Sequence, residues 1–419
     1  MHDHTEIRLG EYGSTSLTTA HLTPRDVDRL RALQRHRCLD LEQNPTGWRL
    51  KAHATVGVLV LDRVRLIIEP KFAIAGDRLM DWLTYALGAP APLPVAARRW
   101  DTSPDGLADL VATALLTECE RLLHDGLRRE YVRRQALASA VRGSLDVTAQ
   151  VTRRYGQLDK LHVRTFDRET DTWDNRVLGT ALRVARTLVT GPQLARDLHS
   201  AAQEFPHSPS LASVLRALDR TRYTRLNARY RAAHIWARLL LRGGGVTDLL
   251  ADRGVVADGL LLAMPALWEA VVRRMFIDAA GSQGWRPVSV TEAKGVTVRG
   301  DLGASSTFRP DLVLGSPGRD PAPRRLLPVD AKYKRYDRSG VGSTDVHQLL
   351  TYSTGYGPKD DPRAVIVHPR TGGGHSQRTL QINGHHGPLG SIHVIGLDTQ
   401  VPPQQAAAHA ASVVPLPHP

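Results

Sequence analysis

One segment, Leu326 to Tyr333, constrains the fold of this chain more than any other part of the sequence. Side chains alternate between the two faces of a β-strand, so Asp330 and Lys332 share one face. The opposite face is apolar along its whole length, because it carries Leu327, Val329, Ala331 and Tyr333. Burying a carboxylate and an ammonium group is costly unless they are paired or bind a metal. The pattern therefore predicts a buried strand whose charged face has a function.

A second apolar segment, Phe308 to Leu314, also predicts a strand and carries Asp311 directly after a proline. The residues between the two segments, Gly315 to Arg325, are rich in glycine and proline, which favours a turn. We therefore expect a β-hairpin with a long turn. In that hairpin Asp311 and Asp330 lie on adjacent strands.

This arrangement suits the hydrolysis of phosphodiesters with a divalent metal. Mg²⁺ prefers hard oxygen ligands and is usually held by one or two carboxylates together with substrate phosphate. Asp311 and Asp330 are the candidate ligands, and the metal would stabilise the negative charge that develops during hydrolysis. Lys332 would orient or deprotonate the attacking water, or neutralise phosphate charge, and the sequence leaves these roles open.

Two predicted helices supply further candidates. A helix near 343–355 places Gln348 and Tyr352 one turn apart on one face. Gln348 is a candidate catalytic residue, whereas we expect Tyr352 to pack in the core. A helix near 264–280 carries Glu269 at the edge of its apolar stripe. Glu269 is a candidate third acid at the metal, and a solvated position is the alternative.

The length of 419 residues predicts two or three domains. Residues 1–95 predict an α+β domain, in which a helix capped by Thr23 precedes an apolar hairpin from Val56 to Ile68. The hairpin ends in the sequence Glu69-Pro70-Lys71-Phe72. Residues 89–98 are rich in proline and alanine and predict a linker.

The rest of the chain changes character twice. Residues 96–252 predict a mainly helical middle domain, with helices near 104–127, 173–190 and 225–242. Residues 253–398 predict the α/β domain that carries Asp311, Asp330 and Lys332. The last residues, 399–419, have no amphipathic period and predict a disordered tail.

The charge of the chain favours a polyanionic partner such as DNA. The net charge is +13 and the pI is near 10.1, and a positive field attracts phosphates. A generally arginine-rich composition is the alternative explanation. The basic segment 128–165 is a candidate contact for DNA or for a protein partner, and a solvated surface is the alternative. It includes Arg128, Arg129, Arg133, Arg134, Arg142, Arg153 and Arg154.

The sequence predicts a cytoplasmic protein that does not enter a membrane. Its first residues lack the cationic-then-apolar pattern of a signal peptide, and no apolar run reaches the length of about 18 residues that a membrane span needs. We expect Cys38 and Cys119 to be reduced thiols. His385, His386 and His393 have no nearby carboxylate partner in the sequence, so we do not expect a metal there.

With these residues in hand, the chain resembles the McrC family, the nuclease subunits of McrBC-type, modification-dependent restriction systems. The nuclease motif is the most specific part of the resemblance, and weaker parts are spread over most of the chain. The segments that carry it are Gly57 to Phe72, Val141 to Asp146, Asp171 to Asn175, Arg309-Pro310-Asp311 and Asp330-Ala331-Lys332-Tyr333-Lys334.

The resemblance implies an α+β multi-domain fold with a C-terminal nuclease domain of the PD-(D/E)xK, restriction-endonuclease-like type. It implies Mg²⁺ as cofactor and an endonuclease activity on DNA. It also implies a partner, an McrB-like AAA+ GTPase ring, whose turnover the N-terminal domain stimulates. The chain has no G-x-x-x-x-G-K-[ST] phosphate loop of its own, which agrees with this division of labour.

Two other functions compete with this hypothesis. The chain could be a non-catalytic adaptor that regulates an AAA+ ring, although its intact Asp311, Asp330 and Lys332 argue against that function. It could also be a self-sufficient nuclease of DNA repair. The large N-terminal and helical regions disfavour this second alternative, because they look like apparatus for binding a partner.

Overall fold

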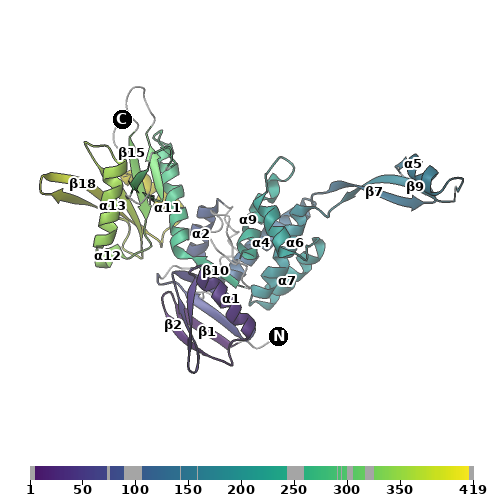
Figure 1. The fold of residues 1–419 in the computed structure, drawn as a ribbon, viewed down its shortest axis with the longest axis horizontal. Coiled ribbons are helices and arrows are strands. Elements are labelled where there is room, and N and C mark those ends of the chain that lie inside the picture. The colour runs from purple at the N-terminus through teal and green to yellow at the C-terminus, as the bar shows by residue number, and fades with distance from the viewer. Residues whose placement is uncertain are drawn as a thin grey trace. The chain divides into compact units, whose positions relative to one another are not determined.

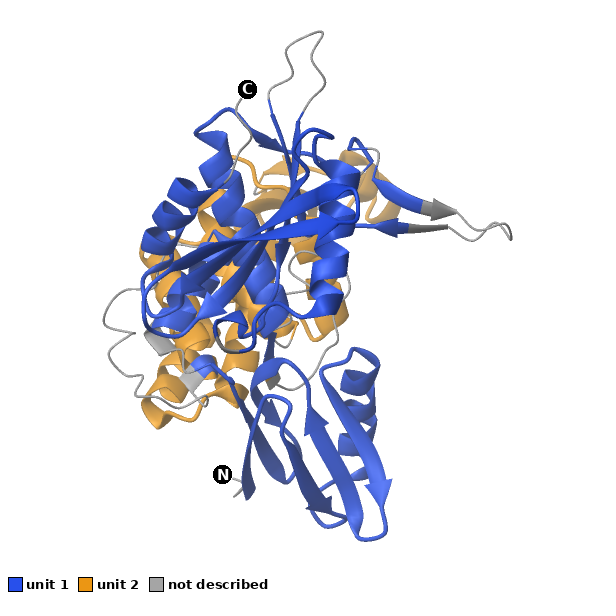
Figure 2. Ribbon diagram, turned by 90° about the vertical axis from the view of Figure 1, so that its left-hand side faces the viewer, with its two compact units in different colours: residues 1–107, 245–257, 261–419 blue, residues 108–244, 258–260 orange. Residues whose placement is uncertain are grey.

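The computed structural model of the chain describes residues 5–72, 76–88, 106–141, 143–157, 159–242, 259–289, 291–293, 295–299, 305–316 and 325–414. The chain forms two compact units, shown in Figure 2. Unit 1 takes in residues 1–107, 245–257 and 261–419, and unit 2 takes in residues 108–244 and 258–260. The N-terminal and C-terminal parts of the chain therefore share one unit. None of the helices in the described ranges is both long enough and apolar enough to cross a membrane.

The N-terminal part of unit 1 confirms the predicted helix and hairpin. Helix α1 begins with a capping box, in which Thr23 accepts the Asp26 amide and Asp26 accepts the Thr23 amide. The predicted hairpin is the antiparallel pair β5–β6, whose apolar side chains are buried. The elements are β1 (Thr5–Gly10), β2 (Ser14–Thr18), α1 (Pro24–Arg35), β3 (Leu39–Asn44), β4 (Gly47–Ala52), β5 (Thr55–Val60), β6 (Val64–Glu69) and α2 (Gly76–Leu87). The strands form two sheets, β1-β6-β5-β10 and β2-β4-β3, where β10 is Gly259–Ala263.

Unit 2 consists mainly of helices. The helices predicted near 104–127 and 173–190 are confirmed, and the one predicted at 225–242 is shorter and follows a 3-10 turn, Ala228–Tyr230. Two helices between them, α7 and α8, were not predicted. The helices are α4 (Gly106–His124), α6 (Trp173–Leu188), α7 (Pro192–Glu204), α8 (Leu211–Asp219) and α9 (Arg231–Leu241).

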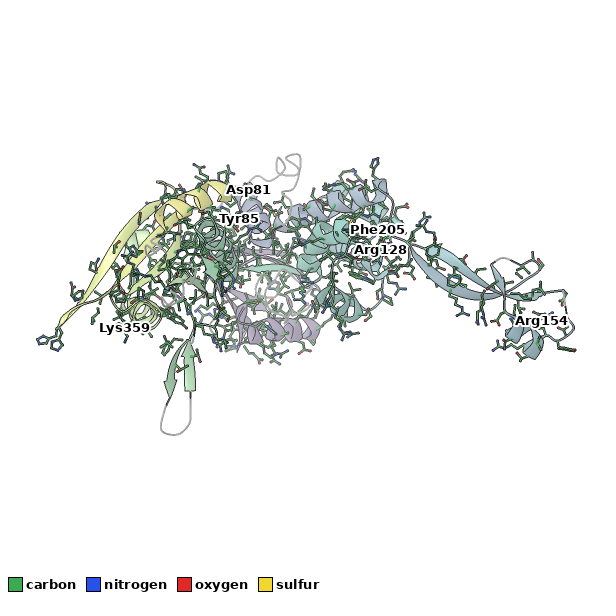
Figure 3. All side chains as sticks on the ribbon, turned by 90° about the horizontal axis from the view of Figure 1, so that it is seen from above. Asp81, Tyr85, Arg128, Arg154, Phe205 and Lys359 are labelled. Atoms are coloured by element: carbon green, nitrogen blue, oxygen red, sulfur yellow. The ribbon has the colours of Figure 1, made fainter. Side chains whose placement is uncertain are left out.

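The basic segment of unit 2 forms a two-stranded ribbon that runs away from the helices (Figure 1). We call residues 130–169 the arm. It contains β7 (Glu130–Ala138), β8 (Ser144–Leu145), α5 (Val147–Arg153) and β9 (Leu161–Glu169), with β9 paired to both other strands. The turn before β8 requires glycine at position 143, because a Cβ atom there would lie 2.3 Å from the Arg164 carbonyl oxygen. Figure 3 shows Arg128 at the root of the arm and Arg154 toward its far end.

Buried polar groups hold the root of the arm in place. The Asn175 side-chain amide donates to the carbonyl oxygens of Arg128 (2.9 Å) and Thr170 (2.6 Å), which flank the two strands of the arm. Tyr230 Oη accepts the Arg128 amide and donates to Asn175 Oδ1, both at 2.7 Å. The Arg128 guanidinium forms an ion pair with the buried carboxylate of Asp174. The sequence from Asp171 to Asn175 thus builds the anchor of the arm.

The C-terminal part of unit 1 is built on a six-stranded sheet in the order β11-β14-β15-β16-β18-β17. The pairs β14–β15 and β17–β18 are antiparallel, whereas β15, β16 and β18 run parallel. A second pair, β12–β13, lies outside this sheet. The strands are β11 (Arg286–Pro287), β12 (Val296–Arg299), β13 (Ser305–Phe308), β14 (Leu312–Gly315), β15 (Leu326–Ala331), β16 (Arg363–Arg370), β17 (Ser376–Gly384) and β18 (Gly387–Asp398).

Helices α11 (Met264–Gly281) and α13 (Ser343–Tyr356) both contact β15, which lies between them in Figure 1. Helix α13 packs on the sheet through a core formed by Leu349, Tyr352, Tyr356, Ala364, Ile366, Ile392 and Val394. On α11, the Trp268 indole donates to the Val367 carbonyl oxygen of β16 at 3.1 Å. A short helix, α12 (Tyr336–Ser339), precedes α13.

Two sequence predictions for this part of the chain are wrong. Residues 403–413 of the predicted disordered tail form a helix, α14 (Pro403–Val413), which contacts α11 and β18. Its buried residues include Ala406 and Ala410, and a row of alanines gives little hydrophobic contrast in the sequence. The segment predicted as one strand from Phe308 to Leu314 is divided, because Pro310 lacks an amide hydrogen and separates β13 from β14. The predicted linker at 89–98 lies outside the described residues.

The structure predicts that unit 2 loses stability in acid through His234. This imidazole is 1% exposed, and burial lowers its pKa from 6.5 to about 4. Between these pH values the unfolded chain binds a proton at His234 that the folded chain does not bind. The stability that neutral His234 contributes is therefore complete above pH 6.5 and is lost as the pH falls toward 4. The loss amounts to about 3 kcal/mol.

We therefore expect His234→Gln to reduce the drop in melting temperature between pH 7 and pH 5. The matched control is His207→Gln, because His207 is exposed in the same unit. Calorimetric melting curves at the two pH values measure the drop. An unchanged drop in His234→Gln would show that this histidine does not control the acid transition.

Candidate functional site

The structure brings Asp311 and Asp330 together as predicted. Leu312 of β14 pairs with Val329 of β15, so Asp311, one residue earlier, lies opposite Asp330. The amide of Ala331 donates to Asp311 Oδ2 at 2.7 Å, which ties this carboxylate to the strand that carries Asp330. The two acids therefore stand side by side at neighbouring strand ends.

Lys332 shares the face of Asp330, which confirms the predicted alternation. Its Nζ lies 2.6 Å from Asp330 Oδ2. On the opposite face, Tyr333 lines a small apolar cavity together with Leu267 and Trp268 of α11. Asp330 is 1% exposed, and its Oδ2 is a buried atom. This oxygen forms the ion pair with Lys332 but, among the described residues, makes no hydrogen bond of good geometry. The strand thus presents a buried acid whose Oδ2 faces the Lys332 ammonium.

Burial dominates the electrostatics of the two acids. It raises the pKa of Asp330 to about 6, and the negative charge of Asp311 adds to the rise while Lys332 opposes it. Burial also raises the pKa of Asp311, although the hydrogen bond from the Ala331 amide partly offsets this effect. Both carboxylates are therefore held in a place where the anionic form lacks solvation, and a bound cation would supply the missing compensation.

Three contacts fix the main chain around Asp311. Arg273 on α11 donates to the Asp311 carbonyl oxygen at 2.9 Å. The hydroxyls of Tyr352 and Tyr356, one turn apart on α13, donate to the carbonyl oxygens of Arg309 (2.9 Å) and Phe308 (2.7 Å). Pro310 interrupts the strand here, and these hydrogen bonds satisfy main-chain carbonyls at the junction of β13 and β14.

Gln348 takes part in this scaffold. Its Nε2 donates to Tyr352 Oη at 2.8 Å, and Tyr352 in turn holds the Arg309 carbonyl. Tyr352 is buried in the core under α13, as predicted. Gln348 therefore orients Tyr352, and it acts on the Asp311 segment through Tyr352 and the Arg309 carbonyl.

Glu269 lies close enough to the site for charges to interact, but it does not complete a metal cage. Burial raises its pKa, the charge of Arg273 one turn further along α11 lowers it, and the charge of Asp330 raises it. Within the described part of the chain, no three Asp, Glu, His or Cys side chains gather into a group that could hold a metal ion. Glu269 thus lies near Asp311 and Asp330, and its role as a third ligand stays a prediction.

Sequence reasoning missed Arg273 and Asp345. Asp345, in the first turn of α13, accepts hydrogen bonds from Lys334 Nζ (2.7 Å) and Tyr336 Oη (2.6 Å). Its charge raises the pKa of Asp330, and the Lys332 charge lowers that of Asp345. An acid in the first turn of a helix is common for dipole reasons, so Asp345 carried no signal of its own.

The donor set fits a hard divalent cation. Two carboxylates on adjacent strands, with a buried Asp330 oxygen whose neighbour is the Lys332 ammonium at 2.6 Å, match the oxygen ligands that Mg²⁺ uses. Water and a phosphate group would supply the remaining ligands. The other residues considered from the sequence do not add to this site, since His385 and His386 occupy the turn between β17 and β18.

A family model, the McrBC 5-methylcytosine restriction system component, matches residues 50–369 of the chain. This span is more than half of the sequence and contains Glu269, Asp311, Asp330, Lys332 and Gln348. No curated protein sequence matches the chain.

Two solved structures are similar to the chain. One match is a chain of the refined half-complex from the tetradecameric assembly of Thermococcus gammatolerans McrB AAA+ hexamers with bound McrC. Its TM-score is 0.68 at 18% identity, over 98% of this chain and 100% of that one. The second belongs to the cryo-EM structure of the Thermococcus gammatolerans McrBC complex, with a TM-score of 0.46 at 20% identity, over 66% of this chain and 88% of that one. The first match shows that the fold is shared along the whole chain.

Asp330 should destabilise the metal-free protein at neutral pH. Its folded pKa of about 6 exceeds the ordinary value of 3.8, so the folded state binds the extra proton between these values and the stability falls as the pH rises through this window. The ionised form then costs about 3 kcal/mol above pH 6. We expect Asp330→Asn to raise the melting temperature in EDTA at pH 7.5, and the gain to vanish near pH 4.

The matched control is Asp360→Asn, because Asp360 is an exposed aspartate beyond α13. Thermal melts of both variants and of the wild type at pH 7.5 and pH 4 give the comparison. A loss of stability in Asp330→Asn at pH 7.5 would contradict the account, since it would mean that the buried anion is well compensated without a metal.

Proposed function

Since the chain belongs to the family of McrBC 5-methylcytosine restriction system components, we propose that it is an McrC-type nuclease subunit. In this proposal it hydrolyses DNA phosphodiesters with Mg²⁺, through a site of the PD-(D/E)xK type. It works in a complex with an McrB-like AAA+ ring and stimulates the GTPase of that ring. The observation that carries the proposal is the pair Asp311 and Asp330 on adjacent strands, with Lys332 Nζ 2.6 Å from Asp330 Oδ2.

Each residue of the site has a task in this reaction. Asp311 and Asp330 would hold the Mg²⁺ ion, and the Ala331 amide keeps Asp311 turned toward its neighbour. When bound, the ion would supply positive charge for the transition state and acidify a water ligand. Lys332 is the nearest ammonium group, at 20% side-chain exposure, and can donate a hydrogen bond to a water or to a phosphate oxygen. Gln348 and Tyr352 support the Asp311 segment from α13.

The arm of unit 2 is the part of the chain that best fits a protein partner. Nine of the fourteen exposed large hydrophobic side chains in the described chain lie between residues 131 and 166. Tyr131 (67% exposed) and Phe166 (64% exposed) are the largest on the two long strands. A two-stranded ribbon with an apolar surface is marginal in water, and docking against a partner would cover that surface. We assign this surface to the AAA+ ring, and the predicted role of residues 1–95 in partner contact stays a prediction.

The same geometry disfavours the two alternative functions, the non-catalytic adaptor and the self-sufficient nuclease. A non-catalytic adaptor has no need for a pair of acids, one of them buried, which costs stability in the absence of a metal. A self-sufficient nuclease has no need for the exposed apolar arm. The proposed subunit requires both features.

Lys332→Ala should abolish DNA cleavage and leave partner stimulation intact. The assay contains methylated plasmid DNA, Mg²⁺, GTP and the McrB-like AAA+ protein of the same host. We expect the cleavage rate to fall by about a hundredfold or more, because the variant loses the cation beside the metal site. The GTP turnover of the partner should stay within about twofold of the wild-type value, because a single substitution away from the proposed docking surface should change it little.

The same assay separates the competing functions. Equal cleavage by wild type and Lys332→Ala, or no cleavage by either with normal GTPase stimulation, would favour the adaptor. Cleavage by the wild type without partner and GTP would favour the self-sufficient nuclease. A variant that loses both cleavage and stimulation has a folding defect, which a melting curve detects.

Substitutions on the arm should weaken partner binding without affecting the fold. We expect Tyr131→Ser together with Phe166→Ser to lower the affinity for the AAA+ ring by about tenfold to a hundredfold, since exposed aromatic residues often dominate interfaces. Leu226→Ser is the matched control, because Leu226 is 73% exposed in unit 2 but outside the arm. Titration by calorimetry measures the affinity, and equal affinities for the double variant and the control would exclude the arm as the docking surface.

A further inference from the structure

The end of strand β6 meets the end of strand β15, which carries the candidate site. Strand β6 ends at Glu69 and leads into Pro70, Lys71 and Phe72. The rings of Phe72 and Tyr333 form an edge-to-face contact, with centroids 4.7 Å apart. Phe72 is 1% exposed and Tyr333 is 7% exposed, so the contact is buried. The N-terminal sheet and the site strand are therefore joined directly within unit 1.

Lys71 and Arg335 form a reciprocal latch across this joint. Lys71 Nζ donates to the Tyr333 carbonyl oxygen at 3.0 Å. In the opposite direction, the Arg335 guanidinium donates to the Lys71 carbonyl oxygen. Each side of the joint thus supplies a cation that holds the main chain of the other side.

Aromatic rings and one carboxylate surround the latch. Lys71 Nζ lies over the rings of Tyr333 (4.4 Å), Tyr12 (5.1 Å) and Phe72 (5.3 Å). Glu11 Oε2 accepts the Lys71 amide at 3.2 Å. Burial lowers the pKa of Lys71, whereas the nearby charge of Glu11 raises it. Such surroundings suit an ammonium group that keeps one position rather than one that moves in solvent.

The latch acts on the residue next to Lys332. The Lys332 amide donates to the Val367 carbonyl oxygen of β16 at 2.9 Å, which holds the main chain before Lys332. The Lys71 ammonium holds the carbonyl of the following residue, Tyr333. The segment from Lys332 to Tyr333 is thus held at both ends, by β16 of the C-terminal sheet and by Lys71 after β6.

We propose that Lys71 is a positioning residue for Lys332, through which the N-terminal sheet keeps the site strand in its active geometry. Lys71 does not touch the carboxylates. It sets where the Lys332 ammonium stands relative to Asp330, and loss of the latch would leave Asp311 and Asp330 in place but displace the cation. The effect on cleavage rests on the proposed function, whereas the effect on the strand does not.

The first test measures amide hydrogen exchange in the full-length protein without partner. Lys71→Met keeps the aliphatic stem and removes the charge, and Lys71→Arg keeps a cationic donor. We expect Lys71→Met to speed exchange in peptides covering residues 331–336 by about tenfold, and Lys71→Arg to restore much of the protection. Lys51→Met is the matched control, because Lys51 is an exposed lysine of β4, in the other sheet of the N-terminal part. Unchanged exchange in Lys71→Met would overturn the proposal.

The second test measures steady-state cleavage with the AAA+ partner, GTP and Mg²⁺. We expect Lys71→Met to lower kcat by about tenfold to a hundredfold, as a misplaced catalytic group does, with the KM for DNA unchanged. Lys71→Arg should recover activity. A fall in kcat that Lys71→Arg does not recover, or a matching rise in KM, would overturn a positioning role.

Two further readouts keep the outcomes distinct. If Lys71→Met fails to fold by melting curve, Arg335→Met tests the same latch from the other side, with the same expected rise in exchange at 331–336. If the wild type does not cleave DNA at all while Lys71→Met still speeds exchange, the proposed nuclease function fails and the latch stands.

Discussion

The acid pair of buried Asp330 and half-buried Asp311 is the constraint on which the C-terminal sheet depends. Asp311 and Asp330 face each other at neighbouring strand ends, where burial raises the pKa of Asp330 to about 6. Such a pair is tolerated because the Ala331 amide binds Asp311 and the Lys332 ammonium stands beside Asp330. Arg273 from α11 and Tyr352 from α13 then hold the interrupted strand around Asp311. The two surrounding helices, α11 and α13, thus help to hold two neighbouring carboxylates in one geometry.

The sequence revealed those parts of the site that follow local rules. Strand alternation predicted that Asp330 and Lys332 share a face, and the hairpin pattern predicted that Asp311 and Asp330 lie on adjacent strands. The helical spacing of Gln348 and Tyr352 was also correct, although Gln348 contacts Tyr352 and not the acids. The McrC-type resemblance read from these motifs is confirmed at the level of the family.

Other parts could not be predicted because they depend on contacts between distant segments. Nothing near Arg273 in the sequence shows that it binds the Asp311 carbonyl. The latch between Lys71 and Tyr333 joins residues more than 250 positions apart, and the Glu69-to-Phe72 motif acquires a role only through it. Helix α14 was missed because its buried residues are alanines, which lack the contrast that reveals an amphipathic helix. The role of Glu269 as a ligand stays a prediction, because a helical wheel shows direction but not distance.

The central claim is that Asp311 and Asp330 together bind a divalent cation. The most direct measurement is anomalous diffraction from crystals of the full chain soaked with Mn²⁺, an ion that accepts the same carboxylate ligands as Mg²⁺. The account predicts a peak within about 2.3 Å of an oxygen of each aspartate, and its loss in Asp330→Asn. Anomalous density at other carboxylates, with none between Asp311 and Asp330 at saturating Mn²⁺, would contradict it.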